Sequence, residues 1–576
     1  MFATPEALND QYEVSVFHGP STQGQGCTRW GYKGVVTTNV TSIVIDCAHN
    51  DWTWIDGTNT AGFDGKPAYG SFPSSAPATP TDPFSNTPGA RHGAVGWTDQ
   101  SGSLFLFGGW GFELSGKPLP DNMSFAMNDL WVCDMSWGDF CEWQLVGGYD
   151  PTPILVGGKP STIGAQLIAA AQSGAGYPGP VPVGRLGAAA WKDLAGNFWL
   201  FGGSDGNNFL NDLWEYNHAV LNSGTYTTME GQWSYKGGTL KIDQAGVYPA
   251  TVPGIGQPGA RTNAVTWLDK SGNFWLFGGY GYDGTQPTAV LGFLNDLWEY
   301  TGGNWVFVGG STTANQFGVY GTAGTPSASN QPGARQEAVG WADANGNLWL
   351  FGGEGLDDAG TANGILNDLW VYNIAGNQWT WVMGAEPVPN STRANHTGVY
   401  PSQTVVGPVN TTGAASTCGL ASGLTVNNQG TNQVLCPAVD LTNAIPGSRW
   451  GAAGWIDAGG NLWLYGGWGL DSKATNGNGA LNDMWVYTPN TIAGQPGTWA
   501  WIKGSNTGGQ KGNYGDMLIP YKTNQDWILG GRSNGTSWID NRGQFWLFGG
   551  EGYDSVSTVG NGFLNDLWRY LPYQDN

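Results

Sequence analysis

The chain alternates short apolar runs with clusters of Gly, Asn, Asp and Pro, and this pattern recurs six times. One unit shows it in residues 263–267, 273–279, 294–300 and 304–310, where aliphatic and aromatic residues are concentrated. Short runs bounded by turn-forming residues, without a helical period, are typical of β-strands. The pattern therefore predicts four strands in each unit and an all-β fold.

The six units share one invariant spacing. Each contains an Arg, and the second Gly of a Gly-Gly pair follows it after 18 residues. The pairs are Arg91/Gly109, Arg185/Gly203, Arg261/Gly279, Arg335/Gly353, Arg449/Gly467 and Arg532/Gly550. A Trp follows each Arg by six residues, and an Asp follows each Trp by two. Such a fixed internal spacing indicates a repeat architecture.

The link between the first two strands of a unit is short and begins with Asp and ends with Gly, as in Asp99–Gly102 and Asp343–Gly346. Asp bonds its own backbone and Gly accepts a positive φ, so this link predicts an antiparallel hairpin. The first strand is rich in Gly and Ala, as in residues 187–190. Small residues in a strand indicate close backbone approach, which fits an innermost position.

The Gly-Gly after the second strand and the Trp of the fourth strand resemble the kelch repeat over about residues 47–576. This resemblance implies a six-bladed β-propeller with four antiparallel strands per blade. The last unit stops without a fourth strand, whereas residues 50–57 match one. We expect this N-terminal strand to complete the last blade and close the ring, because an open ring leaves exposed strand edges.

Three segments lie outside the repeat. Residues 1–46 contain strand-like runs, and we expect an N-terminal extension that packs on its own propeller or adds a strand to a neighbouring subunit in a homo-oligomer or filament. Residues 158–175 form an insertion with a predicted short helix, and residues 385–446 form a second, Thr- and Asn-rich insertion.

The composition of the chain limits the classes of binding partner and bears on where the protein is located. Charged residues make up only 11% of the chain and the net charge is −22, which excludes nucleic acid and anionic membranes as good partners. No apolar stretch reaches membrane-spanning length. The first residues lack the features of a signal peptide, so we expect a signal removed earlier or export by another route.

The cysteines predict an oxidising environment. They fall into three local pairs: Cys27/Cys47, Cys133/Cys141 and Cys418/Cys436. None has the Cys-x-x-Cys spacing of a metal site, and sequence alone leaves other pairings open. Disulfides indicate an extracellular or cell-surface location.

The longest loops indicate where the candidate site lies. The loops after the second and fourth strands are long and fall on one face, which is the default binding face. Three aromatic residues directly follow Gly-Gly and head into these loops, so they are candidate platforms for sugar rings: Trp110, Tyr280 and Trp468. Four Asp residues recur in the same loops and either cap turns or bind Ca²⁺: Asp283, Asp357, Asp471 and Asp554. We expect no cofactor, with Ca²⁺ as the alternative.

A further Asp, in the Asn-Asp of each third strand, matches the six Arg residues in number. This match predicts one structural Arg–carboxylate pair per unit, in preference to a ligand site.

The remaining question is whether the chain is an enzyme. It is distantly similar to the central domain of galactose oxidase, whose copper radical site requires two His, two Tyr and a crosslinked Cys. The five His residues lie in unrelated parts of the unit: His18, His49, His92, His218 and His396. The His-Glu-x-x-His motif of zinc proteases is absent from the sequence. We expect a non-catalytic extracellular scaffold that binds protein or glycan through the long-loop face. The alternative is a secreted enzyme, oxidase-like or carbohydrate-active, with its site on that face.

Overall fold

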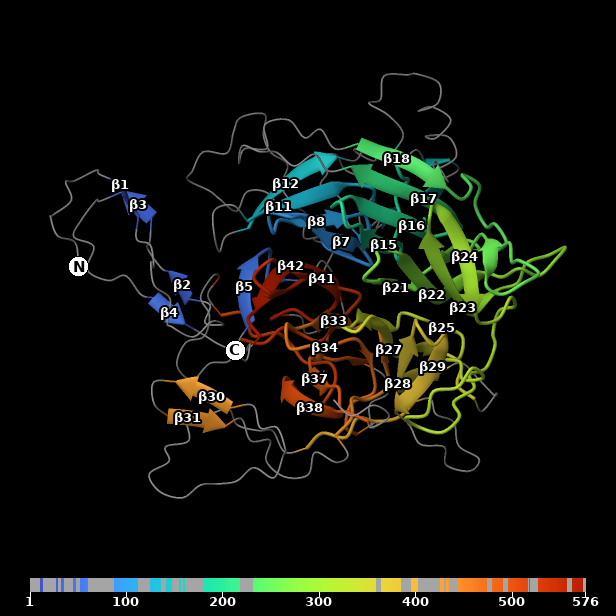
Figure 1. Cartoon of the computed structure of the whole chain (residues 1–576). Coiled ribbons are helices and arrows are strands. Elements are labelled where there is room, and N and C mark those ends of the chain that lie inside the picture. Colours follow the sequence, from blue (N-terminus) through green and yellow to red (C-terminus); the bar gives the residue numbers. More distant parts are fainter. Residues whose placement is uncertain are drawn as a thin grey trace.

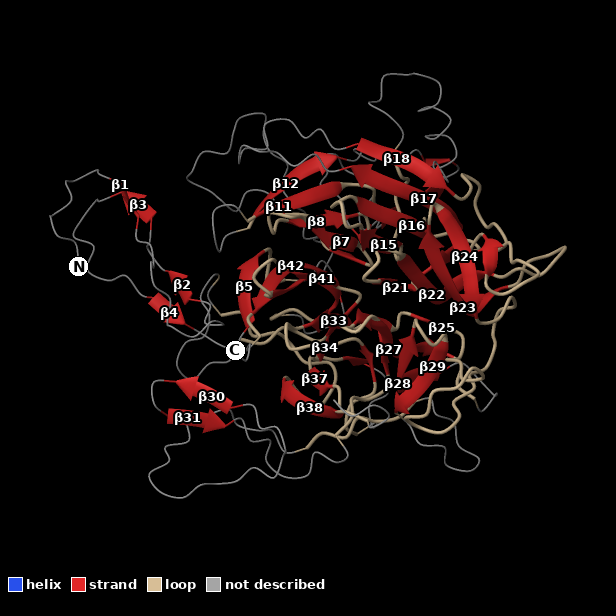
Figure 2. Ribbon diagram, viewed as in Figure 1, coloured by secondary structure: helices blue, strands red, loops and turns tan. Residues whose placement is uncertain are grey.

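The regular elements of this protein are antiparallel β-strands. The computed structural model describes residues 11–13, 27–29, 33–35, 45–47, 52–60, 87–111, 125–135, 141–147, 155–156, 159–160, 181–217, 232–358, 364–384, 395–401, 425–428, 431–434, 444–473, 479–490, 496–515, 517, 527–556 and 562–572. Within these residues every regular element is a strand (Figure 2). The predicted all-β class is confirmed, and the larger sheets have three to six strands, consistent with a β-propeller.

Each unit contributes four principal strands, in the order expected from the apolar runs. The first strands are β7 (Val95–Thr98), β15 (Ala189–Lys192), β21 (Val265–Leu268), β26 (Val339–Ala342), β33 (Ala453–Ile456) and β40 (Thr536–Ile539). The second strands are β8 (Leu104–Phe107), β16 (Phe198–Ser204), β22 (Phe274–Tyr282), β27 (Asn347–Gly355), β34 (Leu462–Tyr465) and β41 (Phe545–Gly552). The third strands are β11 (Leu130–Asp134), β17 (Phe209–Asn217), β23 (Leu291–Thr301), β28 (Gly364–Asn373), β37 (Met484–Thr488) and β42 (Gly562–Tyr570). The fourth strands are β12 (Glu142–Gly147), β18 (Gln232–Gly237), β24 (Asn304–Gly309), β29 (Gln378–Met383), β38 (Thr498–Lys503) and β5 (Trp52–Asp56).

The first-strand Trp links each unit to the next. Its indole N–H donates to a backbone carbonyl of the following unit, as from Trp191 to Trp275 (3.2 Å) and from Trp267 to Trp349 (3.0 Å). In the last unit, Trp538 donates to Phe105 of the first unit (3.0 Å). The first strand of each unit also contacts the first strand of the next unit, and β40 of the last unit contacts β7 of the first. The sheets therefore surround a common centre (Figure 1).

The N-terminal strand β5 occupies the fourth position of the last sheet. It pairs antiparallel with β42, and Trp54 lies opposite Trp568. Beyond its end, the N–H of Thr58 donates to Asn565 (3.2 Å), just as the N–H of Ser311 donates to Asn295 in another unit. Residues 52–58 therefore make the contacts that a local fourth strand makes elsewhere.

In four units the structure corrects the prediction that the second strand ends at Gly-Gly, whereas β8 and β34 do end directly before the Gly-Gly pair. In β22 the register shifts between Phe277 and Gly279, and the strand then continues to Tyr282. Gly278 and Gly279 have φ of 63° and 96°, which side chains other than Gly rarely adopt, so the pair forms a bulge within the strand.

The extended part of the second strand pairs with the Arg segment. These segments are β6 (Arg91–His92), β20 (Arg261–Thr262), β25 (Arg335–Gln336), β32 (Arg449–Trp450) and β39 (Arg532–Ser533). Two units form separate ladders after Gly-Gly, with β9 (Trp110–Gly111), β10 (Phe125–Ala126), β35 (Trp468–Gly469) and β36 (Gly479–Ala480). A further strand, β19 (Gly254–Gly256), pairs with β24.

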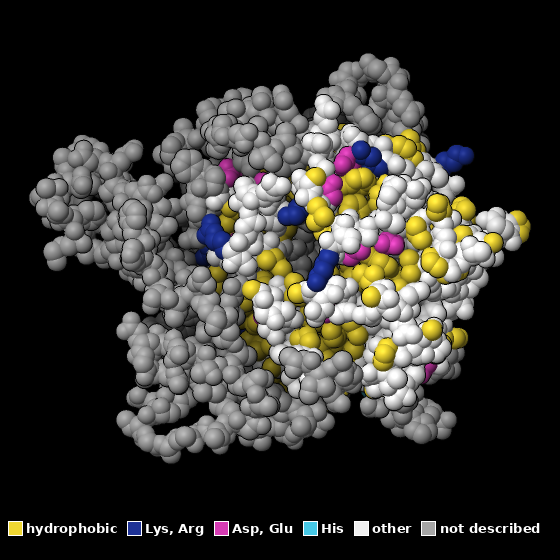
Figure 3. Space-filling view, in the orientation of Figure 1, with side chains coloured by type: hydrophobic (Ala, Val, Ile, Leu, Met, Phe, Trp, Pro, Cys, Tyr) yellow, Lys and Arg dark blue, Asp and Glu magenta, His cyan; other side chains and the backbone are white. Residues whose placement is uncertain are grey.

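Aromatic side chains fill the space between neighbouring sheets. Trp97 stacks on Phe198 of the next unit with ring centroids 5.1 Å apart, and Trp455 stacks on Phe545 at 5.3 Å. Full burial of one indole removes on the order of 200 Å² from water, worth roughly 5 kcal/mol before entropy costs. On the outer surface, Figure 3 shows few charged side chains, scattered among larger uncharged areas.

The segments outside the repeat are described only in part. Four small antiparallel pairs are formed by β1 (Gln11–Glu13) with β3 (Lys33–Val35), β2 (Cys27–Arg29) with β4 (Ile45–Cys47), β13 (Leu155–Val156) with β14 (Lys159–Pro160), and β30 (Thr425–Asn428) with β31 (Thr431–Val434). The predicted short helix in residues 158–175 and most of residues 385–446 lie outside the described residues.

One predicted disulfide is confirmed. Cys133 and Cys141 are bonded and link β11 to the start of β12. Cys27 and Cys47 are opposite each other in the β2–β4 backbone register, and their disulfide stays a prediction. Cys418 and Cys436 lie outside the described residues.

Candidate functional site

The six Arg residues of the repeat each form a buried ion pair with the Asp of the third strand, as predicted. In unit three, Arg261 donates from Nη1 and Nη2 to the two carboxylate oxygens of Asp296, both at 2.7 Å. The pairs are Arg91–Asp129, Arg185–Asp212, Arg261–Asp296, Arg335–Asp368, Arg449–Asp483 and Arg532–Asp566. Such bidentate pairs fix geometry as well as charge.

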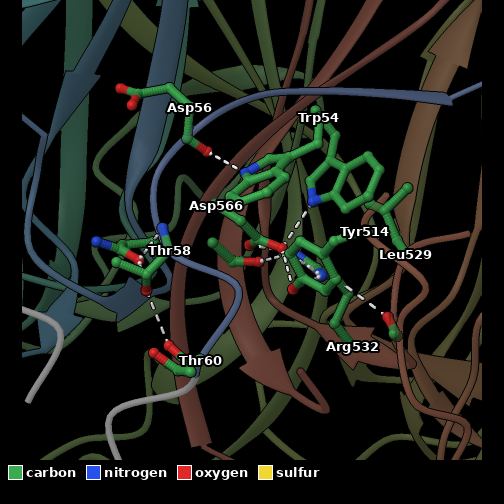
Figure 4. A network of polar contacts seen from close by, with 12 residues as sticks. Trp54, Asp56, Thr58, Thr60, Tyr514, Leu529, Arg532 and Asp566 are labelled. Atoms are coloured by element: carbon green, nitrogen blue, oxygen red, sulfur yellow. Dashed lines mark hydrogen bonds and ion pairs between the residues drawn. The ribbon is translucent and has the colours of Figure 1, made fainter. Parts of the chain in front are cut away.

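Further hydrogen bonds surround the ion pair in unit three. Arg261 also donates to the carbonyls of Gly259 and Gly278, both at 3.0 Å. Asp296 accepts the indole N–H of Trp298 (2.6 Å) and the hydroxyl of Tyr248 (2.7 Å). Figure 4 shows the same arrangement around Asp566, with Arg532 and Tyr514, beside Trp54 of β5. The ion pairs therefore belong to the scaffold.

Two residues after each Arg, the backbone forms a central ring of hydrogen bonds. Each N–H donates to the carbonyl of the equivalent residue in the preceding unit, and the series returns to its start: Gly93 to Asn534, Asn534 to Gly451, Gly451 to Glu337, Glu337 to Asn263, Asn263 to Gly187, and Gly187 to Gly93. All six residues have φ between 54° and 63°. Three are Gly, for which this conformation is relaxed, whereas it is strained for Glu337.

The Glu337 side chain joins units that are far apart in the sequence. Asn263 donates its amide to one carboxylate oxygen (2.7 Å), and Asn534 donates to the other (3.4 Å). The side chains of these two Asn residues lie against Gly of the preceding unit. A side chain at Gly187 would collide with Asn263, and one at Gly451 would collide with Asn534. The ring sequence is therefore matched between neighbours, with Gly beside each Asn.

Glu337 is only half-buried, yet the protein around it is dense enough to remove much of its hydration. Burial raises the pKa of Glu337 to about 7, and the carboxylates of Glu354 and Glu551 add to this rise, while the hydrogen bond from Asn534 opposes it. A carboxyl group with such a pKa exchanges its proton near neutrality.

The residue next to the ring in each unit lies opposite the residue that follows Gly-Gly. We call these six opposed pairs the central row: His92/Trp110, Leu186/Ser204, Thr262/Tyr280, Gln336/Glu354, Trp450/Trp468 and Ser533/Glu551. The pairs occupy equivalent places but differ in chemistry, with aromatic, carboxylate and hydroxyl side chains. Unlike the scaffold positions, the positions of the row carry different residue types in the six units.

The three predicted aromatic residues all belong to this row, in the first, third and fifth units, and the structure corrects their setting. Trp110, Tyr280 and Trp468 lie in β9, β22 and β35 rather than in loops, because the strand resumes after the Gly-Gly bulge. All three are half-buried. Trp468 packs nearly parallel to Trp450 with centroids 6.2 Å apart, and Tyr280 meets Phe293 edge-on at 5.3 Å.

The predicted loop Asp residues lie one or two positions beyond the end of the extended strand, outside the row. Asp283 accepts backbone N–H groups from Thr285 (2.9 Å), Val290 (2.8 Å) and Ala314 (2.9 Å). Burial opposes ionisation of Asp283, but these hydrogen bonds outweigh it and lower its pKa. Asp283 thus clasps two loops together.

The other three loop Asp residues are buried at equivalent positions. Asp471 accepts from the N–H of Lys473 (2.8 Å) and Asp554 from that of Val556 (2.8 Å), so both cap turns. The backbone carbonyl of Asp357 accepts the N–H of Gly318 (3.0 Å). Whether any of these residues binds Ca²⁺ stays a prediction.

Sequence reasoning missed Glu337 and Ser533. The available signal was that Glu337 stands where three other units have Gly. His92 directly precedes Gly93 of the hydrogen-bond ring; its side chain contacts Phe563 with ring centroids 4.9 Å apart, and burial lowers its pKa to about 4. Within the described ranges, no His, Cys, Asp and Glu group is arranged to hold a metal ion, and no helix is long and apolar enough to cross a membrane.

Comparisons with known proteins give distant structural likenesses. No family model and no curated protein matches the chain. The solved structure of YjhT is 12% identical with a TM-score of 0.40, covering 84% of this chain and 95% of its own. A fungal alcohol oxidase of the AA5 family, in complex with copper, is 11% identical with a TM-score of 0.35, covering 84% of this chain and 74% of its own. Likenesses of this degree leave function to the residues of the chain itself.

Proposed function

We propose that this chain is a closed six-bladed propeller of the kelch type, acting outside the cell as a non-catalytic binding protein that takes a glycan at the central row. The variation within the row carries the proposal. Scaffold positions repeat in every unit, whereas the row presents Trp110, Tyr280 and Trp468 beside Glu354 and Glu551. Half-buried aromatic faces with a few polar groups between them are suited to sugar rings and their hydroxyls.

The extracellular part of the proposal is supported by the Cys133–Cys141 disulfide and by the low charge of the chain. The closed ring is supported by the β5–β42 ladder and by the bond from Trp538 to Phe105. Both contacts join the first unit to the last one, so a seventh blade between these units or an open ring would be incompatible with them.

Glycan binding is tested with the intact protein on an array of neutral, acidic and amino sugars, followed by calorimetry of the best ligand. Trp468→Ala is expected to weaken binding about 10-fold or more, because one stacked ring is worth roughly 1–2 kcal/mol. The matched control is Tyr235→Ala, an aromatic residue that is 40% exposed and lies outside the row. Equal loss in both variants, or no glycan bound by the intact protein, would remove the proposal. Formation of a reaction product or of hydrogen peroxide from a bound glycan would show that the protein is an enzyme and would replace the proposal of non-catalytic binding.

The role of the N-terminus is tested by two deletions. We propose that residues 1–46 are dispensable for the fold and mediate any self-assembly, whereas β5 is required. Deletion of residues 1–46 is expected to leave a folded monomer, and deletion of residues 1–60 is expected to expose the edge of β42 and cause aggregation. Assemblies that survive the shorter deletion would refute strand donation, and a stable monomer after the longer deletion would refute closure by β5.

A further inference from the structure

The central row surrounds a carboxylate that lacks a counter-charge. Glu337 accepts only amide donors from Asn263 and Asn534. Glu354 accepts from the amide of Gln336 (2.9 Å). In the part of the chain that the structure describes, neither Glu337 nor Glu354 has a Lys, Arg or His partner, and the six repeat Arg residues are committed to Asp.

A second, independent feature points to a missing donor. Ser533 is 1% exposed, and its hydroxyl has no hydrogen-bond partner among the described residues. Ser533 lies opposite Glu551 in the β39–β41 ladder, and opposed residues project from the same side of a sheet, so its hydroxyl points to the side from which Glu551 acts on Glu337. A buried polar group without a partner is destabilising, so a ligand that supplies the missing hydrogen bond is bound more favourably.

His92 repeats this feature in the adjacent unit. Its Nδ1 is buried and has no partner in the described part of the chain, and its ring contacts Phe563, which lies opposite Glu551 in β42. The low pKa of His92 keeps the imidazole neutral, so one ring nitrogen is an acceptor. The groups in need of a partner are thus carboxylates, a hydroxyl and a neutral imidazole, all of which accept hydrogen bonds.

The shape of the cluster favours an organic cation over a metal ion. The described Asp, Glu, Cys and His side chains do not converge closely enough to hold a metal. An ammonium group carries three N–H donors and can bridge acceptors that are farther apart. The aromatic faces of Trp110, Tyr280 and Trp468 attract a cation as well as stacking on a sugar ring.

We propose that the central row binds an amino sugar, with its ammonium group at Glu337 and Ser533 and its ring on the aromatic side chains. This inference rests on the proposed glycan binding and specifies its ligand class. Binding of the ammonium ionises Glu337 and releases its proton to solvent, because the cation supplies the charge partner that the free protein lacks.

The test compares two sugars with the same ring skeleton, one with charged ammonium groups and one in which these groups are acetylated and neutral. The full-length protein is titrated at about pH 6 with the trimer of glucosamine and with its neutral N-acetylated counterpart. We expect the charged trimer to bind about 10-fold more tightly. Repeating the titration in buffers of different ionisation enthalpy is expected to show release of close to one proton for the charged trimer and none for the neutral one.

Two variants locate the effect. Glu337→Gln preserves the shape of the side chain and one of its two amide contacts, because the Gln oxygen can still accept a hydrogen bond. It is expected to abolish both the preference and the proton release while leaving the neutral trimer unaffected. Ser533→Ala is expected to weaken only the charged trimer, several-fold, and it tests the site should the first variant fold poorly. Trp468→Ala is expected to weaken both trimers equally.

The possible failures are distinguishable. Equal affinity for the two trimers, or a preference that persists in Glu337→Gln and Ser533→Ala, would overturn the ammonium site and leave glycan binding intact. The same conclusion follows when another, neutral glycan binds and neither trimer does. Failure of every glycan on the array would overturn the proposed function and this inference together.

Discussion

Replacing Asp296 by Asn removes one negative charge from the interior while keeping the size of the side chain. Asp296 is fully buried and receives both Arg261 amino groups, the indole of Trp298 and the hydroxyl of Tyr248. The variant leaves the guanidinium buried without a counter-charge. Breaking a buried pair in this way costs about 3–5 kcal/mol, far more than a surface pair is worth.

The repeat supplies a matched control for this prediction. Asp129 makes the same bidentate contact with Arg91, and Trp131 donates to it, but its side chain is 20% exposed. Water can compensate part of the lost charge, so Asp129→Asn is expected to cost roughly half as much. The substitution and the paired Arg are the same in both units, and Tyr248→Phe measures the hydroxyl contact that Asp296 has in addition.

Urea-induced unfolding, followed by Trp fluorescence, gives the two free-energy losses when unfolding is reversible. Unfolding rates at a fixed urea concentration rank the variants when it is not. Tyr248→Phe provides a third point and is expected to cost about 1 kcal/mol, since it deletes one hydrogen bond to the same carboxylate. A loss for Asp296→Asn that is equal to or smaller than that for Asp129→Asn would refute the reasoning that burial sets the value of these pairs.

The remaining predictions concern pH and the contact between the first and last units. Burial raises the pKa of Asp56 from 3.8 to about 7, although hydrogen bonds from Gly57 and Thr87 oppose the rise. Between pH 3.8 and about pH 7, Asp56 therefore keeps its proton in the folded protein and loses it in the unfolded chain. Stability is therefore expected to fall as pH rises through this window, and Asp56→Asn should flatten the curve of unfolding temperature against pH; a stability maximum at pH 8 would contradict this. Gly96→Ala places a methyl group against the indole of Trp538 and is expected to cost about 1–3 kcal/mol, whereas Gly237→Ala, which has open space, should be nearly neutral in the same urea titration. Similar losses in the two Gly variants would show that the packing of Trp538 does not decide stability.

Much of this molecule could be predicted because its interactions repeat. The Arg–Asp pairs followed from one Arg and one third-strand Asp in every unit, and the turns followed from Asp and Gly at fixed positions. The second-strand boundary was predicted wrongly, because a bulge at Gly278 and a strand end at Gly278 have the same local sequence. Only pairing with Arg261 and Thr262 reveals that the strand resumes.

The sequence by itself determined the all-β class, the four strands of each unit and the residues that would be scaffold, since periodicity and turn chemistry are local properties. The tertiary structure alone decided that Glu337 meets Asn263 and Asn534, and that the residues after Gly-Gly form one row. Those contacts join units separated by 74 and 197 residues. Local propensity carries no information at such separations, so the environment of the central carboxylate exists only once the sheets surround a common centre.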